Sequence, residues 1–225
     1  MSSEGRIKVF VVDDHPLFRE GLVQYINRET DMEVCGEAGD TPTALSALNQ
    51  IKADIAIVDL TLQGISGLQL VKVISTQHKK THVLVLSMHD EKLYAERALR
   101  AGAKGYIMKQ EAPREVVAAI RQVLAGKIYL SEALSKHMIT RMVANQPLEG
   151  AAPVDVLSNR ELEVFDYIGQ GFQTREISEK LHLSVKTVES HREHIKNKLN
   201  LSNSTEVIRR AIQWVHSEKG QNESV

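Results

Sequence analysis

Hydrophobic and polar positions follow two different patterns along this chain, and the change comes near residue 126. Before it, short apolar runs rich in Val and Ile show no polar alternation, which is typical of parallel strands buried on both faces. Amphipathic stretches with helical spacing separate these runs. The pattern predicts strands at 7–12, 33–38, 53–60, 82–88 and 105–109, and helices at 16–28, 41–51, 67–78, 91–101 and 113–125.

Helix ends fit the same plan. Pro16 suits a first helical turn, Thr41 is the expected cap of the second helix, and Gly102 and Gly126 follow two helix ends. Parallel strands need crossover connections, which are right-handed. We therefore predict an α/β fold, a doubly wound five-stranded parallel sheet of flavodoxin-like type, followed by a small all-α domain.

Strand patterns are missing from the last part of the chain. A helical stretch at 131–144 precedes residues 145–155, whose prolines and glycine indicate a linker. Further helices are predicted at 159–170, 174–181, 185–199 and 204–217. The predicted domains are 7–125, a helical linker at 126–155, and 156–217.

Composition adds only broad limits. The chain has 225 residues, a net charge of −1 and 42% hydrophobic residues, which suits two small globular domains. Its single cysteine, Cys35, excludes an internal disulfide and fits a reducing compartment. No run approaches the roughly 20 apolar residues of a membrane span, and the N-terminus lacks the apolar stretch of a secretory signal. We expect a cytoplasmic protein.

Candidate chemistry gathers at the ends of the predicted strands. Asp13 and Asp14, Asp59, and Lys109 each follow an apolar run. Ligands of open parallel sheets bind outside the carboxyl ends of the strands. A carboxylate at Asp59 can take a phosphoryl group as an acyl phosphate. Asp13 and Asp14 are suited to hold Mg²⁺, and Lys109 and Ser87 to contact the phosphoryl oxygens.

Each of these residues also has a purely structural interpretation. Acidic pairs at strand ends often begin a loop, and a lysine there can be a solvated strand end. Taken singly, those interpretations are favoured. Suitable groups at the ends of four strands together argue for a phosphoryl site.

The stretches VFVVDDHPLFREGL, IVDLTLQGISGLQL, LSMHD and GAKGYIMK resemble the receiver domain of bacterial two-component response regulators. The resemblance implies that Asp59 takes a phosphoryl group from the phosphohistidine of a sensor histidine kinase, or from a small phosphodonor. It implies a Mg²⁺ (or Mn²⁺) site, phosphoryl contacts from Ser87 and Lys109, and an aromatic switch at Tyr106. The implied metal ligands are Asp13, Asp14, Asp59 and the backbone carbonyl of Thr61.

Some positions leave alternatives open. Gln63 stands where the family usually has proline, and Met88 where a small residue is usual. Thr61 and His89 occupy positions that tune the attacking water in the family. A binding-only regulator with a vestigial pocket is therefore one alternative, and Tyr106 can also be a half-buried ring on an edge strand.

An enzyme is a second alternative. A phosphohydrolase of haloacid-dehalogenase type also uses an aspartyl phosphate. That family places its acid two residues after the nucleophile, whereas Asp13 and Asp14 are adjacent here. The helical C-terminal part would also stay unexplained. We therefore expect a phosphoacceptor rather than an enzyme.

The C-terminal helices contain a helix-turn-helix pattern. Thr174 and Ser184 are expected caps of two helices joined by a tight turn. On the second helix, Val188, His191 and Ile195, together with Leu199, fall on one face. The opposite face is polar and suits a DNA major groove, although acidic residues on it also allow a solvated surface. The residues expected to contact DNA are Lys186, Thr187, Glu189, Ser190, Arg192, Glu193 and Lys196.

The stretches LSNRELEV and TVESHREHIKNKL resemble LuxR-type helix-turn-helix domains. With a receiver in front, the chain resembles the NarL/FixJ class of response regulators. The resemblance implies a recognition helix at 185–199, which binds double-stranded promoter DNA at paired half-sites, and a homodimer on activation. Glu189 is a candidate acceptor for a cytosine amino group. Candidates for the dimer interface on the last helix are Val207, Ile208, Ala211 and Val215.

Overall fold

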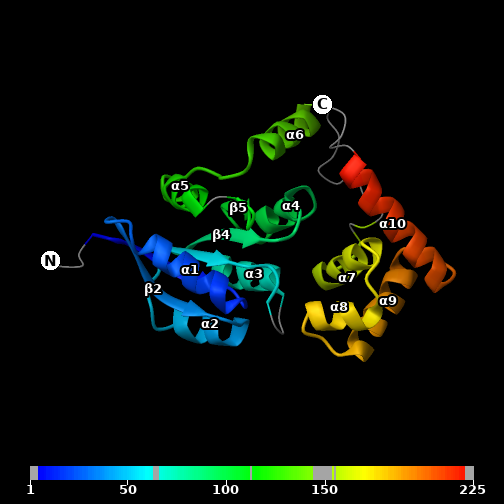
Figure 1. Cartoon of the computed structure of the whole chain (residues 1–225). Coiled ribbons are helices and arrows are strands. Elements are labelled where there is room, and N and C mark those ends of the chain that lie inside the picture. The colour runs from blue at the N-terminus through cyan, green and yellow to red at the C-terminus, as the bar shows by residue number, and fades with distance from the viewer. Residues whose placement is uncertain (1–4, 63–65, 112, 144–153, 155, 221–225) are drawn as a thin grey trace. The chain divides into compact units, whose positions relative to one another are not determined.

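The computed structural model describes residues 5–62, 66–111, 113–143, 154 and 156–220. The chain divides into two compact units, Met1–Thr140 and Arg141–Val225, and each is described here by itself (Figure 1). Residues 144–153 and 155 of the predicted linker, together with Gln63, lie outside the described residues. Within the described part, no helix is long and apolar enough to cross a membrane.

The first unit contains a parallel sheet with the strand order β2-β1-β3-β4-β5. Its strands are β1 (Ile7–Val12), β2 (Met32–Ala38), β3 (Ile55–Val58), β4 (His82–Ser87) and β5 (Gly105–Met108). All four residues of β3 are buried, as expected for a central strand covered on both faces. The predicted α/β class is therefore confirmed. The strand order reverses between β1 and β3, which places a ligand crevice at their carboxyl ends.

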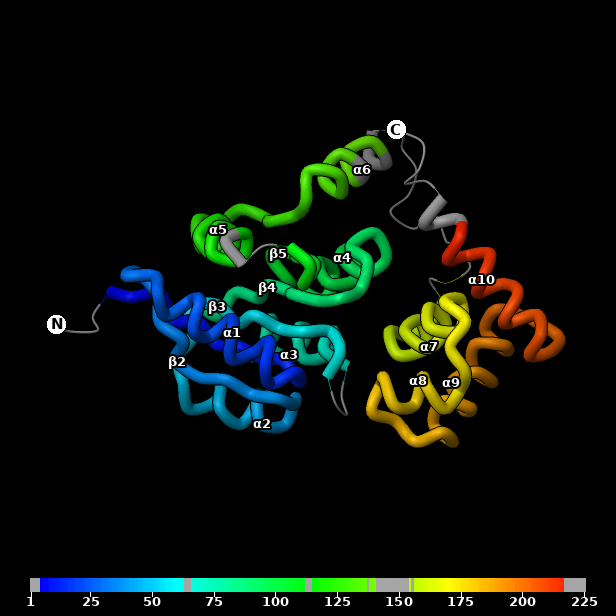
Figure 2. The backbone as a smooth tube through the Cα atoms, viewed as in Figure 1, coloured from blue at the N-terminus to red at the C-terminus, as the bar shows by residue number. Residues whose placement is uncertain are grey.

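Helices cover both faces of this sheet. They are α1 (Pro16–Ile26), α2 (Thr41–Leu48), α3 (Gly67–Gln77), α4 (Glu91–Ala101) and α5 (Pro113–Leu124). A further helix, α6 (Glu132–Val143), follows α5 along the chain. Helices α1 and α5 pack against each other and share one apolar core with the strands, while α3 packs against α2 and α4 (Figure 2). This two-layer cover holds the strand ends in place.

One predicted cap in this unit is wrong by a residue. The N-cap of α2 is Asp40, whose carboxylate accepts the backbone N–H of Thr43 at 2.8 Å and its hydroxyl at 3.0 Å. Thr41 is already helical, and its side chain is buried. Asp40 caps the helix because its backbone is extended and its carboxylate reaches two donors at once.

A short segment after α5 extends the sheet at the β5 edge, which the sequence did not predict. Tyr129 forms a parallel bridge with Gly105, accepts the N–H of Tyr106 at 3.0 Å and donates to the carbonyl of Lys104 at 3.0 Å. A Cβ on Gly105 would lie 2.9 Å from the Tyr129 carbonyl oxygen, so this close approach requires glycine. We call residues 128–131 the edge segment.

The second unit is helical, with α7 (Asn159–Gly169), α8 (Thr174–Lys180), α9 (Val185–Lys198) and α10 (Ser204–Gly220). Its core includes Phe165, whose ring centroid lies 5.5 Å from that of Trp214. A turn joins α8 to α9, and His182 there has a left-handed backbone with φ 51°. The N-cap of α8 is Gln173 rather than the predicted Thr174, because the Gln173 N–H pairs with Glu176 in a capping box.

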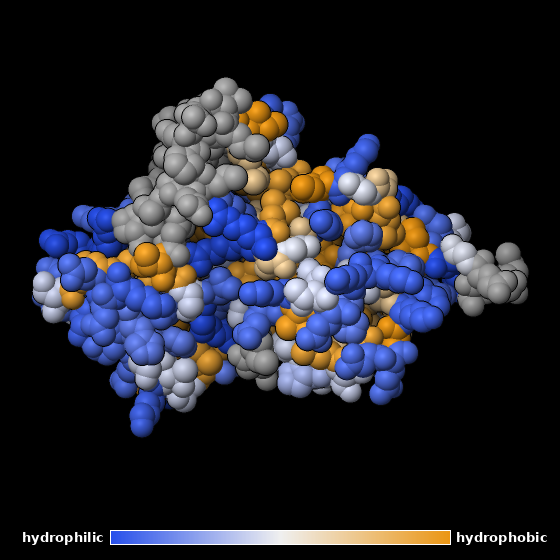
Figure 3. All heavy atoms as spheres, turned by 180° about the vertical axis from the view of Figure 1, so that it is seen from behind, coloured by the Kyte–Doolittle hydropathy of each residue, from blue (hydrophilic) through white to orange (hydrophobic). Residues whose placement is uncertain are grey.

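The molecular surface carries both hydrophobic and hydrophilic residues. On the face shown in Figure 3, hydrophobic residues form patches separated by hydrophilic ones. The large apolar side chains that are exposed in the second unit are Val156, Val185, Ile208 and Ile212. Isolated exposed apolar residues are normal in globular proteins, so only adjacent ones suggest an interface.

Candidate functional site

The predicted acidic site forms at the carboxyl ends of the strands. Asp13 follows β1, Asp59 follows β3, Ser87 ends β4 and Lys109 follows β5. Asp13 and Asp59 are each 2% exposed and Ser87 is fully buried. The parallel register brings these chain-distant residues to one edge, as expected at the switch point.

Lys109 joins two carboxylates across this edge. Its Nζ lies 2.7 Å from Asp13 Oδ2 and 2.7 Å from Asp59 Oδ2, and 4.6 Å from the centroid of the Phe18 ring. Burial disfavours the ammonium, but Asp59 and Asp13 outweigh it and raise the pKa of Lys109. The side chain therefore stays charged and cancels part of the negative charge of the site.

Asp59 differs from an ordinary surface carboxyl. Burial raises its pKa from 3.8 to about 6, Lys109 opposes this rise, and Asp13 adds to it. The backbone N–H of Thr61 donates to Asp59 Oδ1 at 3.1 Å. Asp59 is thus a desolvated carboxylate next to a second acid, and a further positive charge at the site would favour its ionised form.

The acidic cluster offers ligands for a divalent cation. Asp13, Asp14, His15 and Asp59 each place a ligand atom within 4.8 Å of the others. Carboxylate oxygens are the donors that Mg²⁺ and Mn²⁺ prefer, so the residues fit the predicted ion. His15 also belongs to this cluster, with its Nδ1 2.7 Å from Asp14 Oδ1. Its adjacency to two aspartates was the sequence signal.

Two further residues shape the site and were missed by the sequence analysis. A Cβ on Gly67 would collide with the backbone of Asp59 and Leu60, so glycine lets α3 begin against the residues that follow β3. Arg19 donates to the backbone carbonyl of Asp13 at 2.6 Å and thereby supports the loop after β1. Neither residue stands in a pattern that distinguishes it from ordinary helix positions.

A hydrogen-bonded group connects this edge to β5. Tyr106 is 1% exposed and donates its hydroxyl proton to the carbonyl of His89 at 2.8 Å, so its ring is fully buried rather than half-buried. Burial raises the pKa of this hydroxyl well above its usual value. The His89 N–H lies 3.3 Å from Ser87 Oγ, and the His89 ring nitrogen Nε2 lies 3.1 Å from Thr61 Oγ1. Met88 is 56% exposed.

The helix-turn-helix has the expected inner and outer faces. Val188 and Ile195 are fully buried, and Ser184 caps α9 by accepting the N–H of Thr187 at 3.0 Å. Outer residues Lys186, Glu189, Ser190 and Glu193 are exposed. Some charges on this face are already paired or partly covered. Lys196 pairs with Glu193 at 2.5 Å, and burial lowers the pKa of the half-buried Arg192.

The dimer candidates on α10 differ in exposure. Val207, Ala211 and Val215 are 2%, 0% and 5% exposed and pack inside their own unit. Only Ile208 among them is exposed, at 39%, and Ile212 joins it one turn later at 36%. An apolar contact with a second copy in this conformation would therefore use Ile208 and Ile212.

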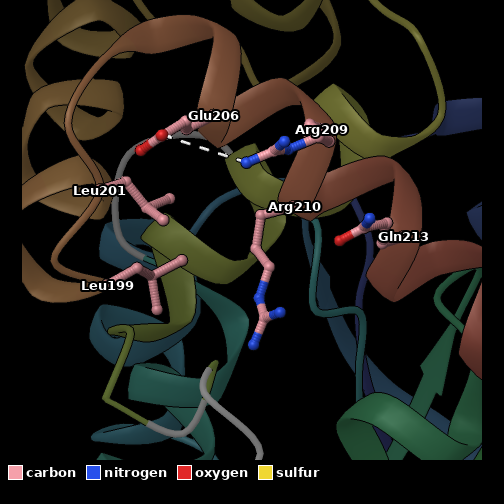
Figure 4. Close-up of a pocket in the computed structure, with 6 residues that line it drawn as sticks. All are labelled: Leu199, Leu201, Glu206, Arg209, Arg210 and Gln213. Carbon is pink, nitrogen blue, oxygen red and sulfur yellow. Dashed lines mark ion pairs between the residues drawn. The ribbon is translucent and has the colours of Figure 1, made fainter.

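A pocket of about 300 Å³ opens between the end of α9 and α10. Figure 4 shows leucine side chains on one side and polar α10 side chains on the other, with an ion pair of 4.0 Å between Glu206 and Arg209. The lining residues are Leu199, Leu201, Glu206, Arg209, Arg210 and Gln213.

Comparison with protein families finds two matches that follow the two units. Residues 9–121 match the response regulator receiver domain, and residues 155–211 match the bacterial regulatory proteins of the luxR family. The oxygen regulatory protein NreC of Staphylococcus aureus is 36% identical over 210 residues, which are 92% of this chain and 97% of NreC.

Solved structures give the same result. RcsB from Salmonella enterica serovar Typhimurium, bound to promoter rprA in the presence of the phosphomimetic BeF₃⁻, has a TM-score of 0.60 and 25% identity. The match covers 91% of this chain and 97% of that one. A structure of two RcsB dimers bound to two parallel DNAs has a TM-score of 0.56 and 25% identity, with coverage of 91% and 97%.

Proposed function

This chain belongs to the bacterial response regulators that carry a receiver and a LuxR-family DNA-binding domain, and we propose how its residues perform that role. It is a phosphorylation-dependent transcriptional regulator of a two-component system. In the proposal, a sensor histidine kinase phosphorylates Asp59, and the modified receiver controls DNA binding by α9. The observation that carries it is the buried bridge from Lys109 to Asp13 and Asp59 at 2.7 Å each.

Asp59 is the proposed nucleophile. An oxygen of its carboxylate forms a bond to phosphorus while the P–N bond of the kinase phosphohistidine breaks, and the released imidazole nitrogen takes up a proton. Lys109 then follows the new phosphoryl oxygens, because they carry more negative charge than the carboxylate did. The Ser87 hydroxyl donates a further hydrogen bond to the same group.

The proposed metal ligands are Asp13, Asp14, Asp59 and the backbone carbonyl of Thr61. A bound Mg²⁺ or Mn²⁺ supplies positive charge that offsets the repulsion between the carboxylates and the phosphoryl group. The His15 ring nitrogen Nδ1 lies 2.7 Å from Asp14 Oδ1. The His15 backbone N–H donates to Asp13 Oδ1 at 2.9 Å. The protein thus orients both carboxylates before an ion binds.

The output route runs through β5. The His89 backbone N–H donates to Ser87 Oγ, and the Tyr106 hydroxyl donates to the His89 carbonyl. A movement of Ser87 toward Asp59 would therefore displace His89 and, through it, Tyr106. The Tyr106 backbone N–H is bonded to Tyr129 of the edge segment at 3.0 Å. The edge segment is further anchored by the Ser131 hydroxyl, which donates to Glu91 at the start of α4. A shift of β4 and β5 is therefore expected to reach the segment that leads to α6.

DNA contact is proposed for the outer face of α9, with Glu189 toward a base and Lys186, Thr187 and Arg192 toward the backbone. The remaining members of the proposed contact set are Ser190, Glu193 and Lys196. A homodimer on paired half-sites is proposed because the similar RcsB forms dimers on DNA. We expect the protein to act in the cytoplasm, where promoter DNA is accessible.

The test uses the full chain with acetyl phosphate and Mg²⁺. We expect one phosphoryl group per chain and tighter binding to sites selected from a random DNA pool. Asp59→Asn should abolish both effects. Asp54→Asn is the matched control, because Asp54 accepts the Lys8 N–H at 2.8 Å and an amide oxygen can do the same.

Three outcomes would contradict the proposal. DNA binding that responds to acetyl phosphate in Asp59→Asn would remove Asp59 from the mechanism. An unlabelled wild-type chain that still binds DNA would indicate a vestigial receiver pocket. Continuous hydrolysis of a small phosphate ester would indicate an enzyme instead of a phosphoacceptor.

A further inference from the structure

A second cluster of metal-ligating side chains lies in the DNA-binding unit. Glu161, His191 and His194 each place a ligand atom within 4.8 Å of the other two. Glu161 stands in the first turn of α7, whereas the two histidines stand three residues apart on α9. Residues at this spacing face the same side of a helix, so both imidazoles meet the same carboxylate. The receiver's acidic pocket is a separate group of residues in the other unit.

The two oxygens of Glu161 have different neighbours. Oε2 accepts the Ser158 N–H at 2.7 Å and the Lys198 ammonium at 2.7 Å. Oε1 lies 3.8 Å from His194 Nδ1, which is too long for a hydrogen bond. One oxygen therefore completes the helix cap while the other faces the His194 ring.

His191 contributes an unusual atom. Its Nδ1 is buried and has no hydrogen-bond partner among the residues that the structure describes. Such an atom is rare in folded proteins and calls for an explanation, of which a bound water or ion is one.

We propose that Glu161, His191 and His194 bind a late first-row divalent cation such as Zn²⁺. The bound ion would link the recognition helix α9 to α7. Two imidazole nitrogens and one carboxylate oxygen form a common three-ligand zinc set, with water at the fourth position. Nitrogen ligands favour such ions over Mg²⁺, which prefers the oxygen ligands proposed in the receiver pocket.

The geometry needs only side-chain movement. Ligand atoms at about 2.0–2.1 Å from a tetrahedral ion lie roughly 3.4 Å apart, so the cluster must contract from its present spread. His194 can supply this movement because its side chain is 63% exposed. The positive groups nearby are Lys198, which is 42% exposed and stays on Oε2, and Arg160, which pairs with Glu163. These two positive charges weaken cation binding, but neither is paired with Glu161 Oε1.

The experiment titrates Co²⁺ into the full chain in excess Mg²⁺, which keeps the receiver pocket filled with the hard ion. We expect the visible absorption of tetrahedral Co²⁺ with nitrogen ligands, and its loss when Zn²⁺ is added. His194→Asn should weaken binding at least about tenfold. His216→Asn is the control, since His216 is an exposed histidine of the same unit outside the cluster.

Thermal unfolding gives an independent measurement. Trp214, the only tryptophan of the chain, reports on the DNA-binding unit. Zn²⁺ should raise the unfolding temperature of the DNA-binding unit in the wild type and in His216→Asn, but not in His194→Asn. Unchanged Co²⁺ spectra in His194→Asn, or no tetrahedral band in the wild type, would reduce the cluster to a simple His194–Glu161 ion pair. Labelling of Asp59 should be the same in all three proteins, so the result is independent of the phosphorylation proposal.

Discussion

The two units each contain a buried carboxylate with a lysine Nζ at 2.7 Å, yet the two pairs behave differently. Asp59 pairs with Lys109 in the receiver, and Glu161 pairs with Lys198 in the DNA-binding unit. The carboxylate side chains are only 2% and 5% exposed, but Asp59 lies deeper in the protein than Glu161. The pKa of Asp59 is raised to about 6, whereas that of Glu161 is lowered.

Depth of burial and the neighbouring groups together explain the opposite pKa shifts. Burial opposes ionisation at both sites, but hydrogen bonds from Lys198 and Ser158 outweigh it at Glu161. At Asp59, Lys109 is shared with Asp13, whose own charge further raises the pKa. A second acid and a shared lysine therefore distinguish the site proposed to take a cation and a phosphoryl group from the carboxylate that caps a helix.

Replacing each lysine should produce the largest difference in stability between the two pairs. Lys109→Met leaves two buried carboxylates without their ammonium and should destabilise the receiver by about 3–5 kcal/mol near neutral pH. Lys198→Met should cost less than about 1 kcal/mol, because Lys198 is 42% exposed and Glu161 keeps the Ser158 N–H.

Urea unfolding can measure both effects, with far-UV circular dichroism for the receiver and Trp214 fluorescence for the other unit. Each transition is to be analysed separately, since a two-domain chain need not unfold in one step. Equal losses of stability for the two substitutions would show that the pairs are equivalent after all.

The pH dependence of Asp59→Asn should be the next largest effect. Below pH 3.8 Asp59 is protonated in the folded and the unfolded chain. As the pH rises toward about 6, Asp59 loses its proton in the unfolded chain before it does so in the folded chain. The unfolded state is therefore favoured progressively, and the wild type becomes less stable. Asn has no such loss. The variant should therefore gain stability relative to the wild type by about 3 kcal/mol across this range in EDTA.

Adding Mg²⁺ is the control for that measurement. A bound cation stabilises the ionised Asp59 carboxylate, so the difference between wild type and Asp59→Asn should shrink when the ion is present. A difference that stays flat from pH 4 to pH 7 in EDTA would mean that the carboxyl group is not perturbed.

Glu161→Gln should change stability in the opposite direction. The substitution removes the charge that binds Lys198 and weakens the capping box with Ser158, so we expect a loss of about 1 kcal/mol at pH 7 without added metal. The loss should disappear as the pH falls through the lowered pKa of Glu161, because the wild type then loses the same charge. A stabilised variant at pH 7 would remove the contrast with Asp59→Asn.

The sequence predicted one of these sites far better than the other. Asp13, Asp59 and Lys109 each end an apolar strand, and parallel strands must bring their ends together, so the pattern along the chain determines the site. Glu161 and His191 come from two helices, and a contact between helices depends on packing angles that no local pattern determines. The sequence analysis placed His191 on the same helix face as Val188 and Ile195, and it did not single out Glu161 or His194.

Local choices of hydrogen-bond partner were also hard to predict. Asp40 and Thr41 are both good caps, and only the extended backbone at Asp40 decides between them. The edge segment was missed because a single bridge at Tyr129 leaves no run of alternating residues. The exposed positions on α10 required the actual rotation of the helix, which places Ile208 outside and Val207 inside.

Salt should have the smallest effect, and it tests whether solvent reaches the two pairs differently. Raising the ionic strength from about 0.1 M to about 1 M shortens the screening length from about 10 Å to about 3 Å. In double-mutant cycles, the coupling between Glu161 and Lys198 should fall by roughly 0.3 kcal/mol, because ions can approach the partly exposed Lys198. The coupling between Asp59 and Lys109 should not change, because the Lys109 side chain is 4% exposed. A similar loss at both pairs would mean that the receiver site opens to solvent, and its raised Asp59 pKa would then need another cause than burial.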